Sequence, residues 1–170
     1  MKITDLLLAE LDRESAASRK TLERVPEGKN DWKPHEKSMP LGNLATIVAT
    51  MPAWLDMVVN MDELDINPPG GPKFKPPDWK TRRELLEQFE ASLKKGREVL
   101  QATTDDHLFN TKWRMLAGGK PMSEQVRYVA IRDGIFNHMA HHRGQLTVYL
   151  RLNDAKVPAV YGPSADEGKS

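Results

Sequence analysis

The chain has no cysteine among its 170 residues. This absence excludes disulfides, thiolate metal ligands, iron–sulfur clusters and a cysteine nucleophile from the chemistry of the protein. An excess of charge of either sign is also missing, because 25 Lys and Arg stand against 24 Asp and Glu, for a net charge of +1. A protein with this balance has no general attraction to nucleic acid or to an anionic membrane.

Long apolar runs are absent as well. Hydrophobic residues make up 39% of the chain, and no uninterrupted apolar stretch approaches the roughly 18 residues that a membrane span requires. The first residues, MKITDLLLAELDRE, lack the apolar region and the small-residue cleavage site of a signal peptide. We therefore expect a soluble cytoplasmic protein that forms a single domain over residues 1–170.

The hydrophobic spacing predicts four helices. The first covers residues 3–25. The second begins near Leu41, and Pro52 is expected to kink it because proline lacks an N–H and its ring clashes with the preceding turn. The third covers residues 81–102, and the last starts at Ser123, as its cap, and extends to about residue 153. Apolar stripes on such helices must be buried against one another, so we expect an all-α four-helix bundle.

The predicted connectors are long and rich in proline and glycine. Residues 67–77, NPPGGPKFKPP, cannot continue a helix and are expected to be extended. Gly118 and Gly119 favour a tight turn, so the sequence allows a short hairpin near residues 108–121. The tail after about residue 155 is expected to be extended, with a disordered end.

Three histidines fall within residues 136–146, FNHMAHHRGQL. On a helix His138 and His142 share one face, and two imidazoles at that spacing can bind one divalent ion at about 2.0–2.1 Å. Pairing His138 with His141, three residues away, would leave His142 out. Two histidines at helical spacing are more often ordinary surface or core residues, and a catalytic zinc site needs three protein ligands. The spacing alone therefore leaves both interpretations open.

The region around these histidines resembles a known family. Residues 138–167, HMAHHRGQLTVYLRLNDAKVPAVYGPSADE, resemble the C-terminal helix and tail of DinB/YfiT-like proteins, and residues 39–54, MPLGNLATIVATMPAW, resemble the second helix of that family. Together with the turn Trp32-Lys33-Pro34, the resemblance spans most of the chain. It implies a four-helix bundle with a three-histidine site for one divalent metal, Zn or Ni, and a homodimer. Because some relatives are metal-dependent hydrolases or thiol S-transferases, it also implies a small-molecule or thiol substrate.

The chain departs from the family at the third metal ligand. The family pattern LGxLAxHxAxxPxW, laid on the second helix, places its histidine at Ile47, and isoleucine cannot bind a metal. The metal site is therefore expected to be incomplete, with metal bound weakly or not at all. Glu14 lies on the apolar stripe of the first helix, where it can serve as a surrogate ligand or pair with an arginine from another helix.

Further candidates for substrate binding, or for support of the site, are His141, Arg143 and Tyr161. Arg143 can bind an anionic group through two hydrogen bonds or form an ion pair. Tyr161 lies in the tail, which the resemblance folds back over the bundle, and its hydroxyl can donate a proton only if it is held near the site. Four tryptophans can line a pocket above the site or simply pack in the core: Trp32, Trp54, Trp79 and Trp113.

Two functions of different class follow from these observations. A relative that keeps the bundle and the dimer but has lost its metal centre would act as a binding or structural protein, and Ile47 favours this interpretation. The alternative is an enzyme that uses a divalent metal on His138 and His142 with a surrogate third ligand, to activate water or a thiol. The intact HxxxHRGQ element favours the alternative.

Overall fold

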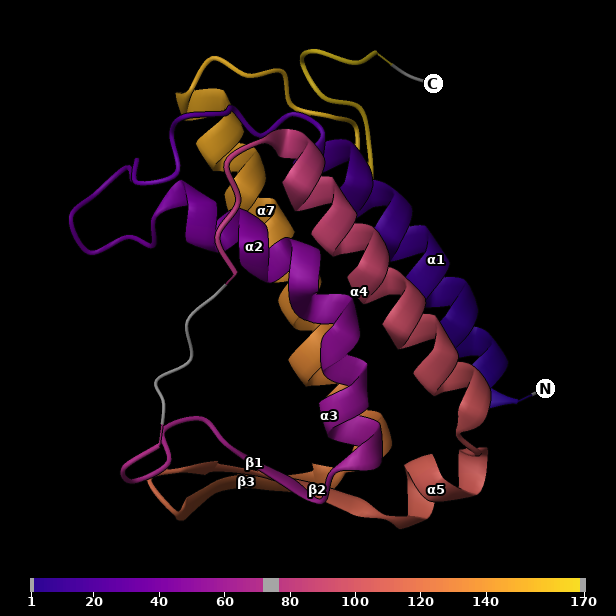
Figure 1. Cartoon of the computed structure of the whole chain (residues 1–170). Coiled ribbons are helices and arrows are strands. Elements are labelled where there is room, and N and C mark those ends of the chain that lie inside the picture. Colours follow the sequence, from indigo (N-terminus) through magenta and orange to yellow (C-terminus); the bar gives the residue numbers. More distant parts are fainter. Residues whose placement is uncertain (1, 72–76, 169–170) are drawn as a thin grey trace.

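The computed structural model describes residues 2–71 and 77–168. Long helices run side by side through most of the molecule, and a small sheet lies across one end of them (Figure 1). In chain order the elements are α1 (Ile3–Leu22), α2 (Leu41–Thr50), the 3₁₀ turn η1 (Met51–Ala53), α3 (Trp54–Asn60), β1 (Glu63–Asp65), α4 (Arg82–Ala102), α5 (Asp105–Asn110), β2 (Lys112–Ala117), β3 (Lys120–Val126), α6 (Arg127–Ile131), the π-helical segment η2 (Arg132–Asn137) and α7 (His138–Leu152). Residues 72–76 of the predicted connector, and 169–170 of the tail, lie outside the described residues.

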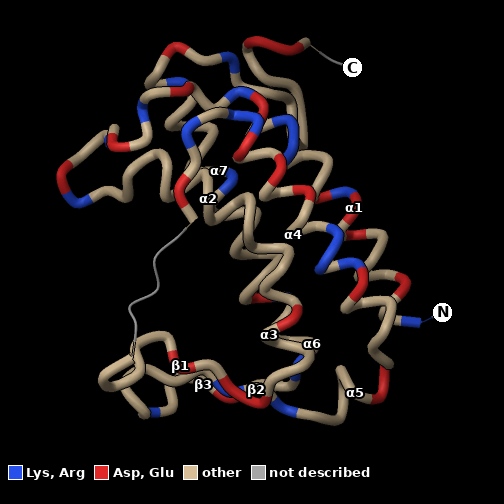
Figure 2. Tube along the Cα trace, in the orientation of Figure 1, with Lys and Arg blue, Asp and Glu red and all other residues tan. Residues whose placement is uncertain are grey.

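Helices α1, α2, α4 and α7 pack against one another around two clusters of buried apolar side chains. The first cluster lies toward the sheet and includes Leu7, Leu55 and Leu100. The second lies at the opposite end and includes Leu22 and Phe89. Figure 2 shows charged residues along α1 and α4 and almost none along α2, which agrees with burial of α2 between its neighbours.

The kink predicted at Pro52 is present as the 3₁₀ turn η1 between α2 and α3. Proline interrupts the ladder of helical hydrogen bonds, and a side chain of α4 compensates: Ser92 Oγ donates to the Thr50 carbonyl at 2.8 Å and accepts from Ala53 N at 2.9 Å. Gly96 makes this close approach of α4 possible, because a Cβ at that position would lie 2.6 Å from the Pro52 carbonyl oxygen. Small and polar residues of α4 therefore hold the bend in place.

The prediction of an all-α protein is wrong, because β1, β2 and β3 form a sheet within the described residues. Strand β1 pairs in parallel with β2, and β2 pairs antiparallel with β3. The predicted glycine turn exists, with φ of 61° at Gly118 and 74° at Gly119, but its strands cover residues 112–126 rather than 108–121. The carboxylate of Asp65 fixes the turn by accepting from Gly118 N at 3.0 Å and from Gly119 N at 2.6 Å.

The last helix does not start at Ser123. That residue lies in β3, opposite Met115 of β2, so its backbone belongs to the sheet and cannot open a helix. Helical structure begins at Arg127 and continues through α6, η2 and α7. The Arg127 side chain is buried and donates to the carbonyls of Val58 and Met61, both at 2.6 Å, at the end of α3. This contact sets the sheet and the last helical stretch against α3.

One stretch of the described chain, Leu41–Asn60, is long and apolar enough to cross a membrane by length and composition. In the structure 61% of its most apolar window is buried by the rest of the protein. This is the pattern of a helix inside a protein core.

Candidate functional site: a histidine pair beside an apolar pocket

His138 and His142 point toward each other from consecutive turns of α7. Their Nε2 atoms are 2.8 Å apart, and their ring centroids are 4.5 Å apart. His142 is buried, and its Nδ1 lies 2.8 Å from Gln145 Oε1. If Nδ1–H of His142 donates to that oxygen, its Nε2 is left as an acceptor for Nε2–H of His138. Two neutral imidazoles thus satisfy the contact between the rings and the contact with Gln145, whereas the 3.4 Å approach of His138 Nδ1 to the Gly134 carbonyl oxygen would need the proton on Nδ1 instead.

Burial lowers the pKa of His142 below its ordinary value. The hydrogen bond with Gln145 acts in the opposite direction, and the nearby His138 and His141 lower the pKa further. The neutral form of His142 is therefore favoured, and neutral imidazole is the form that binds a metal or accepts a proton.

The remaining three histidines make no hydrogen bond with this pair among the described residues. His141 is exposed, with its ring centroid 5.1 Å from that of His142. His35 is exposed on a loop and accepts from Lys37 N at 3.1 Å. The Nε2 atom of His107 lies 2.8 Å from the Val59 carbonyl oxygen, at the end of α3.

The histidine pair supplies two donors that suit a divalent metal. A tetrahedral site with bonds of about 2.0–2.1 Å separates two nitrogens by about 3.3 Å, so the observed 2.8 Å requires only a small opening of the pair. A third donor is not in place: within residues 2–71 and 77–168, no group of three or more His, Asp or Glu side chains is arranged to hold a metal ion. Ile47, half-buried, packs against the first core cluster instead. The described residues therefore do not fit a three-ligand metal site.

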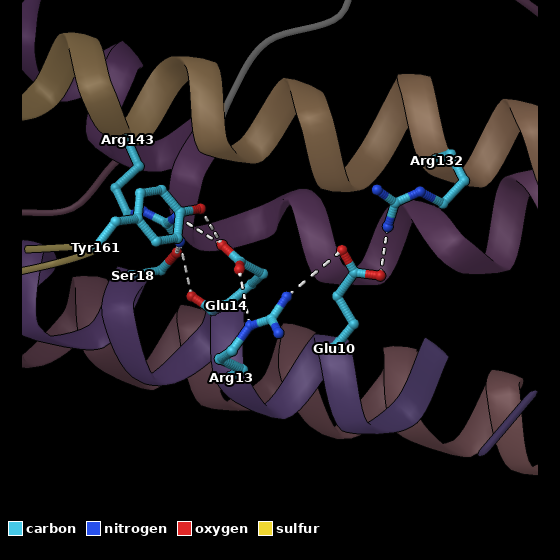
Figure 3. A network of polar contacts seen from close by, with 7 residues as sticks. All are labelled: Glu10, Arg13, Glu14, Ser18, Arg132, Arg143 and Tyr161. Carbon is cyan, nitrogen blue, oxygen red and sulfur yellow. Dashed lines mark hydrogen bonds and ion pairs between the residues drawn. The ribbon is translucent and has the colours of Figure 1, made fainter. Parts of the chain in front are cut away.

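Glu14 is engaged in a different network (Figure 3). Its Oε2 accepts from Arg143 Nη2 at 2.6 Å and from the Tyr161 hydroxyl at 2.5 Å. Burial by itself raises the pKa of Glu14, but the hydrogen bonds from Tyr161 and Arg143 outweigh it, so the pKa lies below its ordinary value. The carboxylate is thus ionised and shared between α7 and the tail.

Arg143 is enclosed by this network, with 1% of its surface exposed. Its Nη1 donates to the Glu14 carbonyl at 2.9 Å and to Ser18 Oγ at 3.1 Å, and its Nη2 also donates to the Tyr161 hydroxyl. Tyr161 is 71% exposed as a residue, so it covers the network from outside while its hydroxyl bonds to Glu14 and Arg143. The donors of Arg143 face protein groups, and together these residues join α1, α7 and the tail.

A pocket of about 870 Å³ lies between α3, the sheet and η2. We call it the sheet pocket, and its wall includes the apolar side chains of Trp54, Met57, Val58, Trp113, Met115 and Ile135. The volume lies within the range of about 300–1,000 Å³ that is typical of small-molecule sites. His138 belongs to the same wall, with its ring centroid 5.9 Å from that of Trp54. The histidine pair thus adjoins the pocket through His138.

The π-helical segment η2 forms one side of the sheet pocket, directly before His138. Asp133, Gly134 and Ile135 of this segment line the pocket. A π-helical segment lacks the regular hydrogen bonds of an α-helix, and such segments occur frequently at functional sites. Here η2 widens the helix just where the pocket meets the histidine pair.

Of the four tryptophans considered as pocket residues, two line the sheet pocket. Trp54 and Trp113 are in its wall, whereas Trp79 is buried in the second core cluster and Trp32 packs edge-on against Tyr149 at 5.6 Å. Most of the other wall residues were not identified from the sequence. One of them could have been found from the sequence of β2, KWRMLA. In a strand, alternate side chains point to the same face, so residues 113 and 115 are expected to lie together on one side.

Comparisons with known proteins identify a family model and similar solved structures. A sequence model described as the DinB family matches residues 1–169. The uncharacterized protein YrdA of Bacillus subtilis is 27% identical over 70 residues, a stretch that covers 41% of this chain and only 38% of that protein. A DinB-like protein of Bacillus cereus has a similar structure, with a TM-score of 0.64 and 22% identity, over 88% of this chain and 92% of the other. A second, YjoA of Bacillus subtilis, has a TM-score of 0.69 and 15% identity, over 92% and 99%.

Proposed function

The chain belongs to the DinB family, and from this premise we propose that it is a binding protein for an apolar small molecule, which it holds in the sheet pocket. The single observation that carries this proposal is the pocket of about 870 Å³ with an apolar wall beside His138. Binding of an apolar ligand there would remove the apolar surface of the ligand and that of the pocket wall from water. Each Å² of apolar surface removed stabilises the complex by about 25 cal/mol.

The side chains available as metal ligands favour a binding protein over a metal-dependent enzyme. Two imidazoles hydrogen-bond to each other, Ile47 stands at the family's third-ligand position, and the Glu14 carboxylate is held by Arg143. An open site with two protein ligands competes poorly for metal, because structural and catalytic zinc sites use three or four.

Occlusion of the sheet pocket tests the proposal. A Cβ on Gly134, in the pocket wall, would meet no neighbouring heavy atom within 4 Å, so leucine can be placed there without a clash at its first carbon. Gly144 of α7 has the same open surroundings and does not line the pocket, which makes Gly144→Leu a matched control. Both changes remove a glycine from a helix and should alter its propensity similarly.

We expect the neutral dye Nile red to bind the wild-type protein and the control with a rise in fluorescence, and to bind Gly134→Leu at least about tenfold more weakly. Quenching of tryptophan fluorescence should report the same event through Trp54 and Trp113. Equal binding of the dye to both variants, or no binding to the wild type, would show that the sheet pocket is not a ligand site.

The second candidate is a divalent-metal enzyme, a hydrolase or thiol S-transferase, and the convergence of His138 and His142 at 2.8 Å favours it. Metal analysis of protein purified without a histidine tag separates the two candidates. Stoichiometric zinc or nickel that is lost in His142→Ala supports the enzyme, whereas substoichiometric metal in both proteins supports the binding protein.

We also propose that the protein acts as a cytoplasmic homodimer: the family resemblance suggests the dimer, and the absence of cysteine suits a reducing compartment. Sedimentation equilibrium should give twice the mass of one chain. Fractionation of the native cells should recover the protein in the soluble cytoplasmic fraction.

A further inference from the structure

The charged groups that line the sheet pocket are all acidic within the described residues. Asp65 and Asp133 are in its wall, and no described lysine or arginine is. Neither carboxylate forms an ion pair with a side chain of the described residues. The described cations nearby have other partners, since Arg114 pairs with Glu63 at 2.7 Å and Arg132 pairs with Glu10. Asp65 therefore has no ion-pair partner among the described side chains, and Asp133 has only the adjacent Arg132, which interacts with it electrostatically while its guanidinium is bonded to Glu10.

Both carboxylates are held in place by neutral donors. Asp65 accepts from the backbone N–H groups of Asn67, Gly118 and Gly119 at 2.6–3.0 Å, and these bonds, that from Asn67 first, lower its pKa. Asp133 accepts from the side-chain amide of Asn137 at 3.2 Å, one turn along η2. Such bonds orient a carboxylate, but they do not cancel its negative charge.

The wall also contains two tryptophans. Trp54 and Trp113 both line the pocket, and indole is the side chain whose face attracts a cation most strongly. An anionic ligand would meet two carboxylates and no described lysine or arginine in the pocket wall. A neutral ligand could donate a hydrogen bond to a carboxylate but would gain neither the charge attraction nor the cation–π contact. A cation on an apolar body uses all of these features together.

Building on the proposed function, we propose that the ligand of the sheet pocket is an apolar molecule that carries a positive charge, such as a hydrophobic amine or a quaternary ammonium compound. The apolar body lies against the wall formed by Met57, Val58 and Met115, and the charged group lies near the carboxylates. Exposed ion pairs and a cation–π contact each contribute modestly, so together they favour the cation by about tenfold over a neutral compound of the same shape.

A matched series of probes tests this proposal: octylammonium, octan-1-ol and octanoate, each below its micelle concentration, displacing Nile red from the wild-type protein in low salt. We expect octylammonium to bind about tenfold more tightly than octanol, and octanoate to bind more weakly than octanol. The advantage of the cation should shrink when salt is raised from 20 to 500 mM, because exposed charges are screened.

Asp133→Asn removes one charge while keeping the shape of the side chain. It should reduce the preference for octylammonium over octanol by about two- to fivefold. Asp106→Asn is the matched control, because Asp106 is also exposed, also accepts from an asparagine one turn along its helix, at 2.7 Å, and does not line the sheet pocket. The control should keep the full preference.

The outcomes distinguish this inference from the proposed function. If Nile red binds and is lost in Gly134→Leu, but octanoate competes as well as octylammonium, the pocket binds ligands and the charge preference is refuted. If Asp133→Asn and Asp106→Asn change the preference equally, the effect is not local to the pocket and the inference is also refuted. If Nile red does not bind the wild-type protein, both proposals are refuted together.

Discussion

Replacing Arg143 with methionine removes the cation that neutralises the buried carboxylate of Glu14. The side chain of Arg143 is 1% exposed and donates to Glu14 Oε2 at 2.6 Å, to the Glu14 carbonyl at 2.9 Å and to Ser18 Oγ at 3.1 Å. Methionine is a flexible apolar side chain that supplies none of these donors. Because Glu14 is only 5% exposed, the variant leaves a buried carboxylate with Tyr161 and the exposed Arg13 as its remaining partners.

The expected loss is large. Removing one partner of a buried ion pair costs about 3–5 kcal/mol, which for a domain of this size lowers Tm by about 6–20 °C. Removing both charges in the double variant Glu14→Leu/Arg143→Met leaves no unpaired charge, so we expect the double variant to be more stable than the Arg143→Met single variant. The coupling between the two positions should be at least about 2 kcal/mol.

Urea unfolding at pH 7, followed by circular dichroism, measures these free energies for the wild type, both single variants and the double variant. Arg151→Met is a matched control, because Arg151 pairs with Asp166 at 2.5 Å but is half exposed, and its loss should cost less than about 1 kcal/mol. If Arg143→Met costs no more than this control, or if the effects of the two single variants simply add, the network does not join α1, α7 and the tail as argued.

Three further predictions concern acid stability, the bend between α2 and α3, and the metal ligands. In the folded protein the pKa of Glu14 lies below its ordinary value of 4.5. The ionised carboxylate therefore stabilises the fold above about pH 4.5, and this stabilisation is lost as the pH falls through the lowered pKa. In Glu14→Gln the unfolding free energy should consequently fall less steeply between about pH 6 and pH 3 than in the wild type. Gly96→Ala should destabilise the protein by about 1–3 kcal/mol in urea unfolding, despite better helix propensity, because the new Cβ would lie 2.6 Å from the Pro52 carbonyl oxygen. Ile47→His should raise Tm in the presence of zinc but not in EDTA, since a ligand that binds only the folded state stabilises it; an unchanged Tm with zinc would count against placing this residue at the third-ligand position.

The helices were predictable because their signals are local. Apolar residues at helical spacing mark the buried faces of α1, α2 and α4. Thr81 caps α4 as a threonine before a helix should, with its Oγ1 accepting from Glu84 N at 3.3 Å. Pro52 interrupts the second helix because proline has no N–H and its ring clashes with the preceding turn. The resemblance to DinB-like proteins was also correct, and the family match over residues 1–169 confirms it.

The start of the last helix was not predictable in the same way. Ser123 is a favourable cap by residue type, but its backbone pairs with Met115 in the sheet. The sheet also depends on β1, which reaches β2 only because the chain returns there after α3. A pairing between segments about fifty residues apart leaves no periodic pattern in either segment. Such tertiary pairing can override the local preference of a residue for helix or strand.

The sequence by itself determined the long helices, the family and the two histidines on one face of the last helix, because each depends on residue types at short, fixed spacings. Tertiary structure decided that these rings bond to each other, that the Glu14 carboxylate is held by Arg143 and Tyr161, and that an apolar pocket lies between α3, the sheet and η2. These features join residues from distant parts of the chain. Their existence depends on how close packing brings the elements together, which no spacing along the chain encodes.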